Sequence, residues 1–292
     1  ELFITQSAVS RQIQQLEDLL GLSLFNRTRH GVELTQAGQQ YYQSIKPYLI
    51  GLEQCTLDVI THKGLGGTLK LGVVPTFATR WLLPKLQRFN QIHPEITIHL
   101  ETSTKPFLFN ENIFDAAIYA GTQQQIDHWP GTQTHFLMTE DVVPVCSPQL
   151  IEKHFPDAKK INAHCYDLDS EQIIQLPLLQ QTTRLNIWQE WCEKHQIEHP
   201  KPFEGQRHEL FSMLAVAATH SMGMALIPQM LIKKELESSE LVIATNKTLT
   251  GVRSYYLVHS SQENSMLIEK FVDWIQLELK NEGLPYSFGT IE

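Results

Sequence analysis

From residue 68 to the end of the chain, short apolar runs that are typical of strands alternate with segments of helical periodicity. Interleaved strands and helices predict an α/β unit whose sheets are mostly parallel. The stretch is too long for one such sheet, so we expect two lobes. The expected strands are Leu69–Val74, Ile96–Thr102, Asp115–Ala120, Asp141–Cys146, Leu178–Gln181, Met222–Ile227 and Ser254–Val258. The expected helices are Thr79–Gln91, Pro148–Lys153, Asn186–Lys194, Leu210–His220, Gln229–Lys234 and Met266–Lys280.

A glycine-rich segment (HKGLGGTLK, residues 62–70) precedes this unit and is typical of a linker. Before it, residues 36–63 are predicted to form a long helix with Thr35 as N-cap. Apolar residues of this helix repeat at alternating spacings of four and three, which favours a seam between two subunits over packing on the chain's own α/β unit. We expect Pro47 and Gly51 to kink the helix. The predicted dimerisation residues are Tyr41, Ile45, Tyr48, Leu52, Cys55 and Val59.

A shorter helix is predicted at residues 7–20, with Ser7 as N-cap and Gly21 as its stop. Its apolar stripe consists of Val9, Ile13, Leu16 and Leu20. The other face is polar, with side chains of the types that bind base edges and phosphates, although an ordinary solvated face is the alternative. The candidate DNA-binding residues here are Gln6, Ser7, Ser10, Arg11 and Gln14.

Two short apolar pieces, Leu22–Phe25 and Val32–Leu34, flank a polar tip and predict a β-hairpin. Arg27 and Arg29 at this tip suit a wing that touches phosphates or the minor groove. One helix and one hairpin are too few to bury a core, so we expect further helices to precede Glu1.

Charge and reactive motifs narrow the function classes. The net charge of −9 argues against nucleic-acid binding, so support for a DNA-binding function must come from the sequence pattern and not from charge. Neither a nucleophile elbow, a P-loop nor a metal-binding spacing is present, and we therefore expect no catalytic residue, metal or cofactor. We interpret the four scattered cysteines as reduced thiols in a cytoplasmic protein that does not enter a membrane.

The segment TQSAVSRQIQQLEDLLGLSLFNRTRHGVELTQAGQQYY closely resembles the LysR-type transcriptional regulators. It is similar to that family's recognition helix, its wing and the start of its linker helix. The segments GGTLKLGVVPTFATRWLLPKLQRFNQIHPEITIHL, FDAAIYAG and MGMALIP resemble the sensor half more loosely. The resemblance spans essentially the whole chain and is strongest to the branch of glycine-cleavage and β-lactamase regulators.

This resemblance implies an α+β multidomain regulator with a winged helix-turn-helix, a linker helix and a periplasmic-binding-protein-like (type 2) effector domain. It implies double-stranded promoter DNA, a small-molecule effector and RNA polymerase as partners, and a homodimer or a dimer of dimers (a homotetramer). The domains expected are a partial DNA-binding domain (1–35), a linker helix (36–67) and an effector domain (68–292). In the last, lobe I is expected at about 68–142 and 245–292, and lobe II at about 143–244.

Ligands of open α/β sheets bind beyond the carboxyl ends of strands, and hydroxyl side chains follow three expected strands here. Thr76 also precedes an expected helix, whose amides would attract an anion, although simple capping is the alternative. Arg184 could pair a ligand carboxylate, so an amino-acid-like effector or a small organic acid is expected. The candidate effector-binding residues are Thr76, Phe77, Thr102, Ser103, Thr104, Thr182, Thr183, His208 and Glu209.

Three other functions compete with this interpretation. An enzyme would need an activated nucleophile, a metal set or an acid–base pair, and none is evident. A transporter's solute-binding protein would need an export signal, and it would have no use for TQSAVSRQIQQLE. A truncated effector-binding protein without DNA binding differs from the main interpretation only in the missing N-terminal helices.

Overall fold

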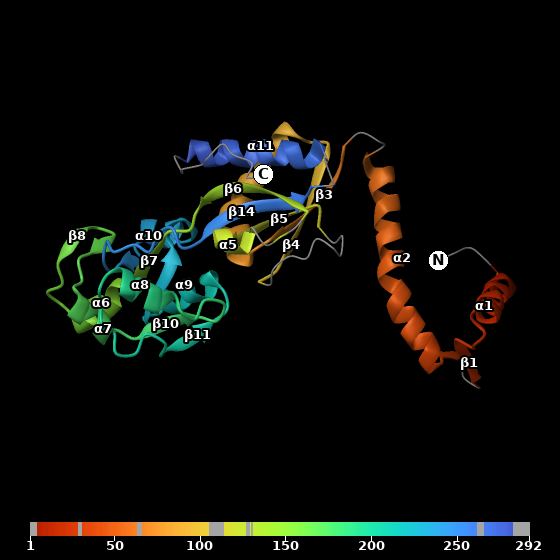
Figure 1. The fold of residues 1–292 in the computed structure, drawn as a ribbon, viewed down its shortest axis with the longest axis horizontal. Coiled ribbons are helices and arrows are strands. Elements are labelled where there is room, and N and C mark those ends of the chain that lie inside the picture. The colour runs from red at the N-terminus through yellow and green to blue at the C-terminus, as the bar shows by residue number, and fades with distance from the viewer. Residues whose placement is uncertain are drawn as a thin grey trace. The chain divides into compact units, whose positions relative to one another are not determined.

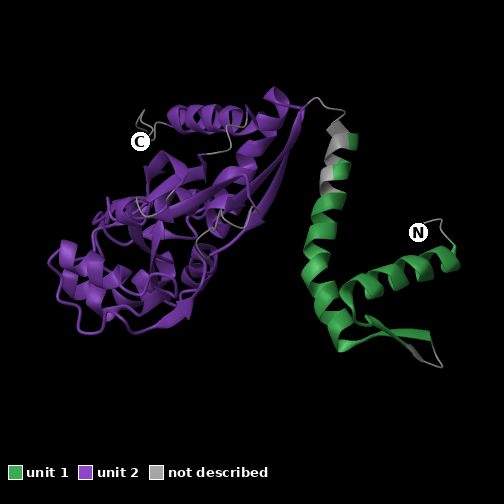
Figure 2. Cartoon of the chain, turned by 45° about the vertical axis from the view of Figure 1, so that its right-hand side comes forward, with its two compact units in different colours: residues 1–65 green, residues 66–292 purple. Residues whose placement is uncertain are grey.

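The computed structural model describes residues 5–28, 31–62, 66–104, 114–126, 129, 131–261 and 266–282. The chain divides into two compact units, residues 1–65 and residues 66–292, which are coloured separately in Figure 2. We describe each unit by itself. No helix in the described ranges is both long enough and apolar enough to cross a membrane.

The described residues of the first unit form two helices and a hairpin, which can be followed in Figure 1. Helix α1 (Gln6–Leu20) ends at Gly21, whose φ of 70° is the left-handed conformation that glycine adopts without strain. Strands β1 (Phe25–Thr28) and β2 (Gly31–Leu34) pair antiparallel, and α2 (Gln36–His62) follows. The prediction of Ser7 as N-cap was wrong: Thr5 is the cap, and its hydroxyl accepts the Ala8 N–H at 3.4 Å.

A carboxylate and a glycine join these elements. Glu17 on α1 accepts the backbone N–H groups of Leu24 and Phe25 at 2.6 and 3.0 Å, which ties the helix to the start of the hairpin. A Cβ at Gly38 would lie 2.0 Å from the carbonyl oxygen of Leu24, so only glycine lets α2 approach the hairpin here. As predicted, the Thr35 hydroxyl caps α2 by accepting the Gly38 N–H at 3.0 Å.

In the second unit, one sheet has five strands in the order β4-β3-β5-β14-β6. These strands are β3 (Gly67–Val73), β4 (Ile96–Thr102), β5 (Ala116–Gly121), β6 (Thr132–Thr139) and β14 (Ser254–Ser260). Strand β3 runs parallel to β4 and β5, whereas β14 is antiparallel to β5 and β6. We call this sheet and its helices lobe I.

The other sheet, lobe II, has seven strands in the order β11-β10-β12-β7-β13-β9-β8. They are β7 (Val142–Cys146), β8 (Lys160–Asn162), β9 (Cys165–Tyr166), β10 (Leu178–Gln181), β11 (Gln206–His208), β12 (Met224–Pro228) and β13 (Val242–Ile243). Antiparallel pairs join β7 to both of its neighbours. The expectation of mostly parallel sheets was therefore wrong, because the chain crosses twice between lobes and both sheets are mixed.

Helices pack on both sheets and bury large aromatic side chains such as Trp81, Trp188 and Trp191. Lobe I carries α3 (Pro75–Phe77), η1 (Ala78–Leu82), α4 (Leu83–Ile92), α5 (Gln123–Ile126) and α11 (Met266–Asn281). Lobe II carries α6 (Pro148–His154), α7 (Ser170–Gln175), α8 (Ile187–Lys194), α9 (Phe211–Thr219), η3 (Gln229–Leu231) and α10 (Lys233–Glu237). The expected helix Thr79–Gln91 is divided, because its first turn is the π-helical η1.

Two chain segments cross between the lobes, residues 140–141 and residues 244–253. They are hydrogen-bonded where they cross: Glu140 N–H donates to the Arg253 carbonyl at 2.9 Å. Val142, the first residue of β7, exchanges two bonds of 3.1 and 3.0 Å with Leu249 of the second segment. We call this paired crossing the hinge. It fixes where the two lobes face each other.

Candidate functional site

The predicted DNA-binding side chains of α1 lie on one exposed surface. Gln6, Ser7, Ser10, Arg11 and Gln14 are all exposed. The Gln14 amide donates to Asp18 at 2.9 Å, and the Ser7 hydroxyl lies 3.0 Å from that of Thr5, so both are held near the helix surface. Arg27 lies in β1 but its side chain is outside the description, and Arg29 is outside the described residues.

Helix α2 is one continuous helix through Pro47 and Gly51, the two residues at which we expected a kink. Of the predicted seam residues, Tyr48 is 80% and Leu52 65% exposed, whereas Tyr41 and Ile45 are half-buried. The side chains of Cys55 and Val59 lie outside the description. Within the first unit, the apolar positions of α2 are therefore left open to a partner.

A cavity of about 170 Å³ lies between the two lobes. Five of the predicted effector-binding residues line it: Thr76, Phe77, Thr104, Thr183 and Glu209. Phe77 is fully buried and stacks on Trp81 and Tyr255, so it forms the floor rather than a polar contact.

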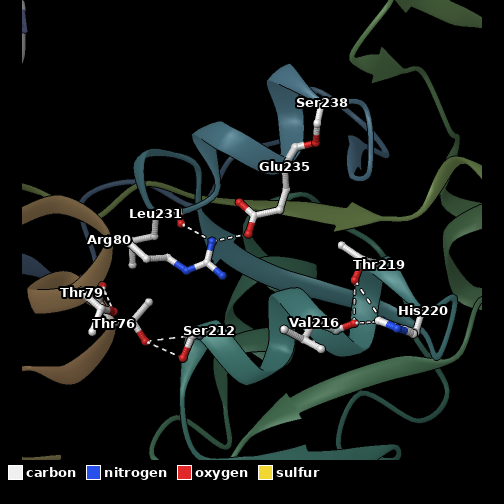
Figure 3. A network of polar contacts seen from close by, with 10 residues as sticks. All are labelled: Thr76, Thr79, Arg80, Ser212, Val216, Thr219, His220, Leu231, Glu235 and Ser238. Carbon is white, nitrogen blue, oxygen red and sulfur yellow. Dashed lines mark hydrogen bonds and ion pairs between the residues drawn. The ribbon is translucent and has the colours of Figure 1, made fainter. Parts of the chain in front are cut away.

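Thr76 joins the lobes directly (Figure 3). It is 5% exposed, accepts the Ser212 N–H at 3.2 Å and donates toward the Ser212 hydroxyl at 3.5 Å. Thr76 lies inside the short helix α3 instead of preceding a helix, so its partner is the first turn of α9 in the other lobe. Nearby, Arg80 of η1 pairs with Glu235 of α10 and donates to the Leu231 carbonyl at 3.2 Å.

The cavity wall also contains an unsatisfied amide. Gln181, at the end of β10, is 6% exposed and donates to the Glu209 carbonyl at 3.4 Å. Its Oε1 is buried without a hydrogen-bond partner among the described residues. A buried acceptor of this kind is costly unless it is satisfied by a ligand or water. Across the cavity, the Thr104 hydroxyl donates to the Glu209 carboxylate at 2.8 Å.

We expected Arg184 to pair with a ligand carboxylate, but its guanidinium is already paired with a carboxylate of the chain. Both of its terminal nitrogens bond Glu140, one of them at 2.8 Å, and its guanidinium lies 4.8 Å from the centre of the Phe211 ring. Burial lowers the pKa of Arg184 to about 10, which still leaves it charged at neutral pH. The pair fixes the hinge to the loop that follows β10.

Comparison with known proteins agrees with this architecture. The family model for the bacterial regulatory helix-turn-helix protein of the lysR family matches residues 1–39, and the model for the LysR substrate binding domain matches residues 62–280. The glycine cleavage system transcriptional activator of Escherichia coli is 31% identical over 99% of this chain and 90% of its own length. This chain belongs to the LysR family of transcriptional regulators.

Two solved structures have the same fold as this LysR regulator. The effector binding domain of AmpR from Citrobacter freundii superposes with a TM-score of 0.62 at 23% identity, over 73% of this chain and 98% of that one. Full-length AphB from Vibrio cholerae superposes with a TM-score of 0.59 at 22% identity, over 94% of this chain and 90% of that one. A DNA-binding regulator with an effector domain is therefore confirmed over an enzyme, and the helix-turn-helix match favours it over an effector-binding protein without DNA binding.

The remaining predicted effector residues lie away from the cavity of the LysR regulator. Thr102 is exposed at the end of β4, and Ser103 follows it without lining the cavity. Thr182 lines a different cavity at the hinge. His208 lines an open surface beside α9, and its Nε2 is buried without a partner among the described residues.

Sequence reasoning missed four polar residues of the cavity: Tyr119, Gln125, Arg253 and Tyr255. Tyr119 and Tyr255 lie on the antiparallel pair β5 and β14, which are distant in sequence. Burial raises the pKa of Tyr255 to about 12, so its hydroxyl stays protonated. The one available signal was Arg253, a lone basic residue directly before an expected strand.

Proposed function

We propose that this regulator contacts promoter DNA through the polar surface of α1 and the tip of the hairpin. The DNA-binding residues would be Gln6, Ser7, Ser10, Arg11, Gln14, Arg27 and Arg29. Exposure of the five α1 residues on one surface supports this assignment. The domain boundaries at 1–35, 36–67 and 68–292 belong to the same proposal, as does action in the cytoplasm, where promoter DNA and RNA polymerase are found.

We further infer that α2 pairs two copies of the chain, in a dimer or a dimer of dimers, through the seam around Tyr48 and Leu52. Two large apolar side chains at heptad spacing, each more than half exposed, support this. Pairing places two α1 helices on one DNA duplex, which is the geometry that two half-sites require.

The effector of this proposal is a small amino-acid-like molecule or a small organic acid in the inter-lobe cavity. One observation carries it: Gln181 presents a buried, unpartnered amide oxygen at a wall that is shared by both lobes. A ligand donor at this oxygen would relieve a cost of about 1–3 kcal/mol. The same ligand would contact Thr104, Thr183 and Glu209, and would replace contacts of Thr76 with Ser212.

A thermal-shift screen of the full chain against amino acids and small organic acids tests this function. A ligand at 100 times its Kd adds about 2.7 kcal/mol to the free energy of unfolding. Gln181→Leu is the decisive variant, because it removes the unpartnered oxygen without adding a charge. A ligand that binds wild type and Gln181→Leu equally would place the effector site elsewhere.

A further inference from the structure

A second cavity, larger than the inter-lobe one, lies at the hinge. Its volume is about 340 Å³, against about 170 Å³ for the inter-lobe cavity. It shares only Thr183, Arg184 and Arg253 with the inter-lobe lining. Its other walls are the hinge itself and the loop and first turn of α8. A volume above 300 Å³ is within the range of small-molecule sites.

The ion pair of Arg184 and Glu140 lies where the two cavities meet, and Glu140 lines only the hinge cavity. Arg184 lines both, and its side chain is 11% exposed, whereas that of Glu140 is 2% exposed. Because each charge of the pair is satisfied by the other, neither is available to a hinge ligand without breaking a buried bidentate contact. The pair therefore acts as a wall of the hinge cavity, and its binding groups must be found elsewhere.

Two opposite charges in the hinge lining lack an ion-pair partner. Arg253 donates to the Ala120 carbonyl at 3.5 Å, and no acidic side chain of the described residues pairs with it. Glu190, in the first turn of α8, is half-buried; its charge partly offsets the lowering of the Arg184 pKa by burial, but it forms no ion pair among the described residues. Both charges line one compartment that is part polar, through residues such as Thr182 and Asn186, and part apolar. The apolar part consists of Val142, Leu185, Ile187, Leu249 and Val252.

We propose that the hinge cavity is a second ligand site and that it binds a small aliphatic amino acid. Arg253 binds the carboxylate of this ligand and Glu190 binds its ammonium group. The aliphatic part packs on Val142, Ile187 and Leu249, each of which is at most 6% exposed. A zwitterion with a short apolar body satisfies both charges and the apolar part of the wall at once.

This inference goes beyond the effector function and does not depend on it. A ligand here contacts both segments of the hinge and lobe II, through Glu140, Leu249 and Glu190. It therefore binds differently to different lobe arrangements, and that difference is the requirement for a regulatory site.

Isothermal calorimetry on the full chain, with the twenty standard amino acids, 4-aminobutanoate and 5-aminopentanoate as probes, tests the proposal. Val252→Trp fills the cavity from a 36% exposed position, and Ile161→Trp on β8 is its matched control at 48% exposure. We expect an aliphatic probe to bind wild type and Ile161→Trp, and to bind Val252→Trp at least tenfold more weakly. Equal binding to all three proteins would overturn the proposal, as would no binding by any probe.

Charge selectivity provides the second test. Glu190→Gln keeps the shape of the side chain and removes its charge, so the bound amino acid should lose about tenfold in affinity. Its des-amino analogue should bind wild type and Glu190→Gln alike. Gln181→Leu, in the inter-lobe cavity, should leave the hinge ligand unaffected. A probe that is weakened by Gln181→Leu but not by Glu190→Gln would show an inter-lobe ligand and would contradict a hinge site.

Discussion

The two units of this regulator differ most in how much they bury. No residue of α1 is buried, and long apolar side chains of α2 such as Tyr48, Leu52 and Leu57 are more than half exposed. The second unit instead encloses Trp81, Trp188 and Trp191 at 2% exposure or less. The second unit is thus stabilised by its own core, whereas the described part of the first unit leaves large apolar side chains exposed.

The largest expected effect is in the core of the second unit. Trp188 is fully buried and donates its indole N–H to the Leu179 carbonyl at 2.9 Å. Trp188→Ala should lower the free energy of unfolding by about 3–5 kcal/mol, because it leaves a cavity and an unpaired carbonyl. Scanning calorimetry measures this loss. In the exposed control Leu57→Ala, an equal loss would contradict the difference between the units.

Association should be the most sensitive property of the first unit. Leu52→Asp places a charge in the proposed α2 seam, which should weaken dimerisation by about 3–5 kcal/mol. Light scattering coupled to size exclusion reports the mass. Leu57→Asp, at 54% exposure on the same helix but outside the heptad, is the matched control. If Leu52→Asp keeps the parent's mass, the seam is wrong.

Gly38 tests whether the joint of α2 and the hairpin matters for DNA binding. A Cβ there meets the Leu24 carbonyl oxygen at 2.0 Å, so Gly38→Ala should displace the hairpin and cost about 1–3 kcal/mol. Gly51→Ala in the same helix meets nothing within 4 Å and should stabilise by up to about 1 kcal/mol. Operator titrations in a gel-shift assay should separate the two variants, and identical affinities would rule out a role for this contact.

Single DNA contacts should have effects of similar or smaller size. Arg11→Ala and Gln6→Ala should each weaken operator binding by about 1–3 kcal/mol through lost base contacts, without unfolding the chain. Arg29→Ala should instead weaken binding to all sequences and reduce the salt slope by about one unit. Lys153→Ala, an exposed cation of the second unit, is the control. Unchanged gel-shift affinity for Arg11→Ala would refute the assigned surface.

The smallest expected effect is a change in the effector's Kd. It should distinguish two threonines, Thr76 and Thr102, that each lie near a strand end. Thr76→Val removes a hydroxyl that bonds Ser212 in the cavity wall, and should raise the effector's Kd several-fold, or about 0.5–1.5 kcal/mol. Thr102→Val changes an exposed hydroxyl outside the lining and should leave the Kd unchanged. Calorimetry with the effector measures both, and the reverse order would move the site toward β4. Operator binding should stay intact in both.

The sequence predicted what depends on neighbouring residues. Helix α1, the hairpin and α2 follow from local spacing and from Gly21 and Thr35, and they lie within a few residues of their expected bounds. Strands of two or three residues, such as β9, β11 and β13, are too short to leave a period-two pattern. Their existence depends on pairing that only the folded chain provides: β11 with β10, β13 with β7, and β9 with β13.

Residues of the candidate site could be predicted from the sequence only where they closely follow a strand whose end lies at the cavity. Thr76 and Thr104 were found in this way, since each lies a few residues after its strand. The environment of the unpartnered Gln181 and the pair of Arg184 with Glu140 depend on contacts between residues that are 28 and 44 positions apart in the chain. Thr102 resembles Thr76 in sequence context, but it is the exposed last residue of the edge strand β4, and the cavity lining begins only two residues later at Thr104.

The ties between the lobes also have a consequence for rates. Thr76 with Ser212, Arg80 with Glu235 and Thr104 with Glu209 each join lobe I to lobe II through the regulator's own side chains. For the effector site proposed above, a molecule should enter only after these contacts break. At high concentration the observed association rate should therefore stop rising and level off at the opening rate, so that the speed of a transcriptional response is determined by the protein and not by the abundance of its signal.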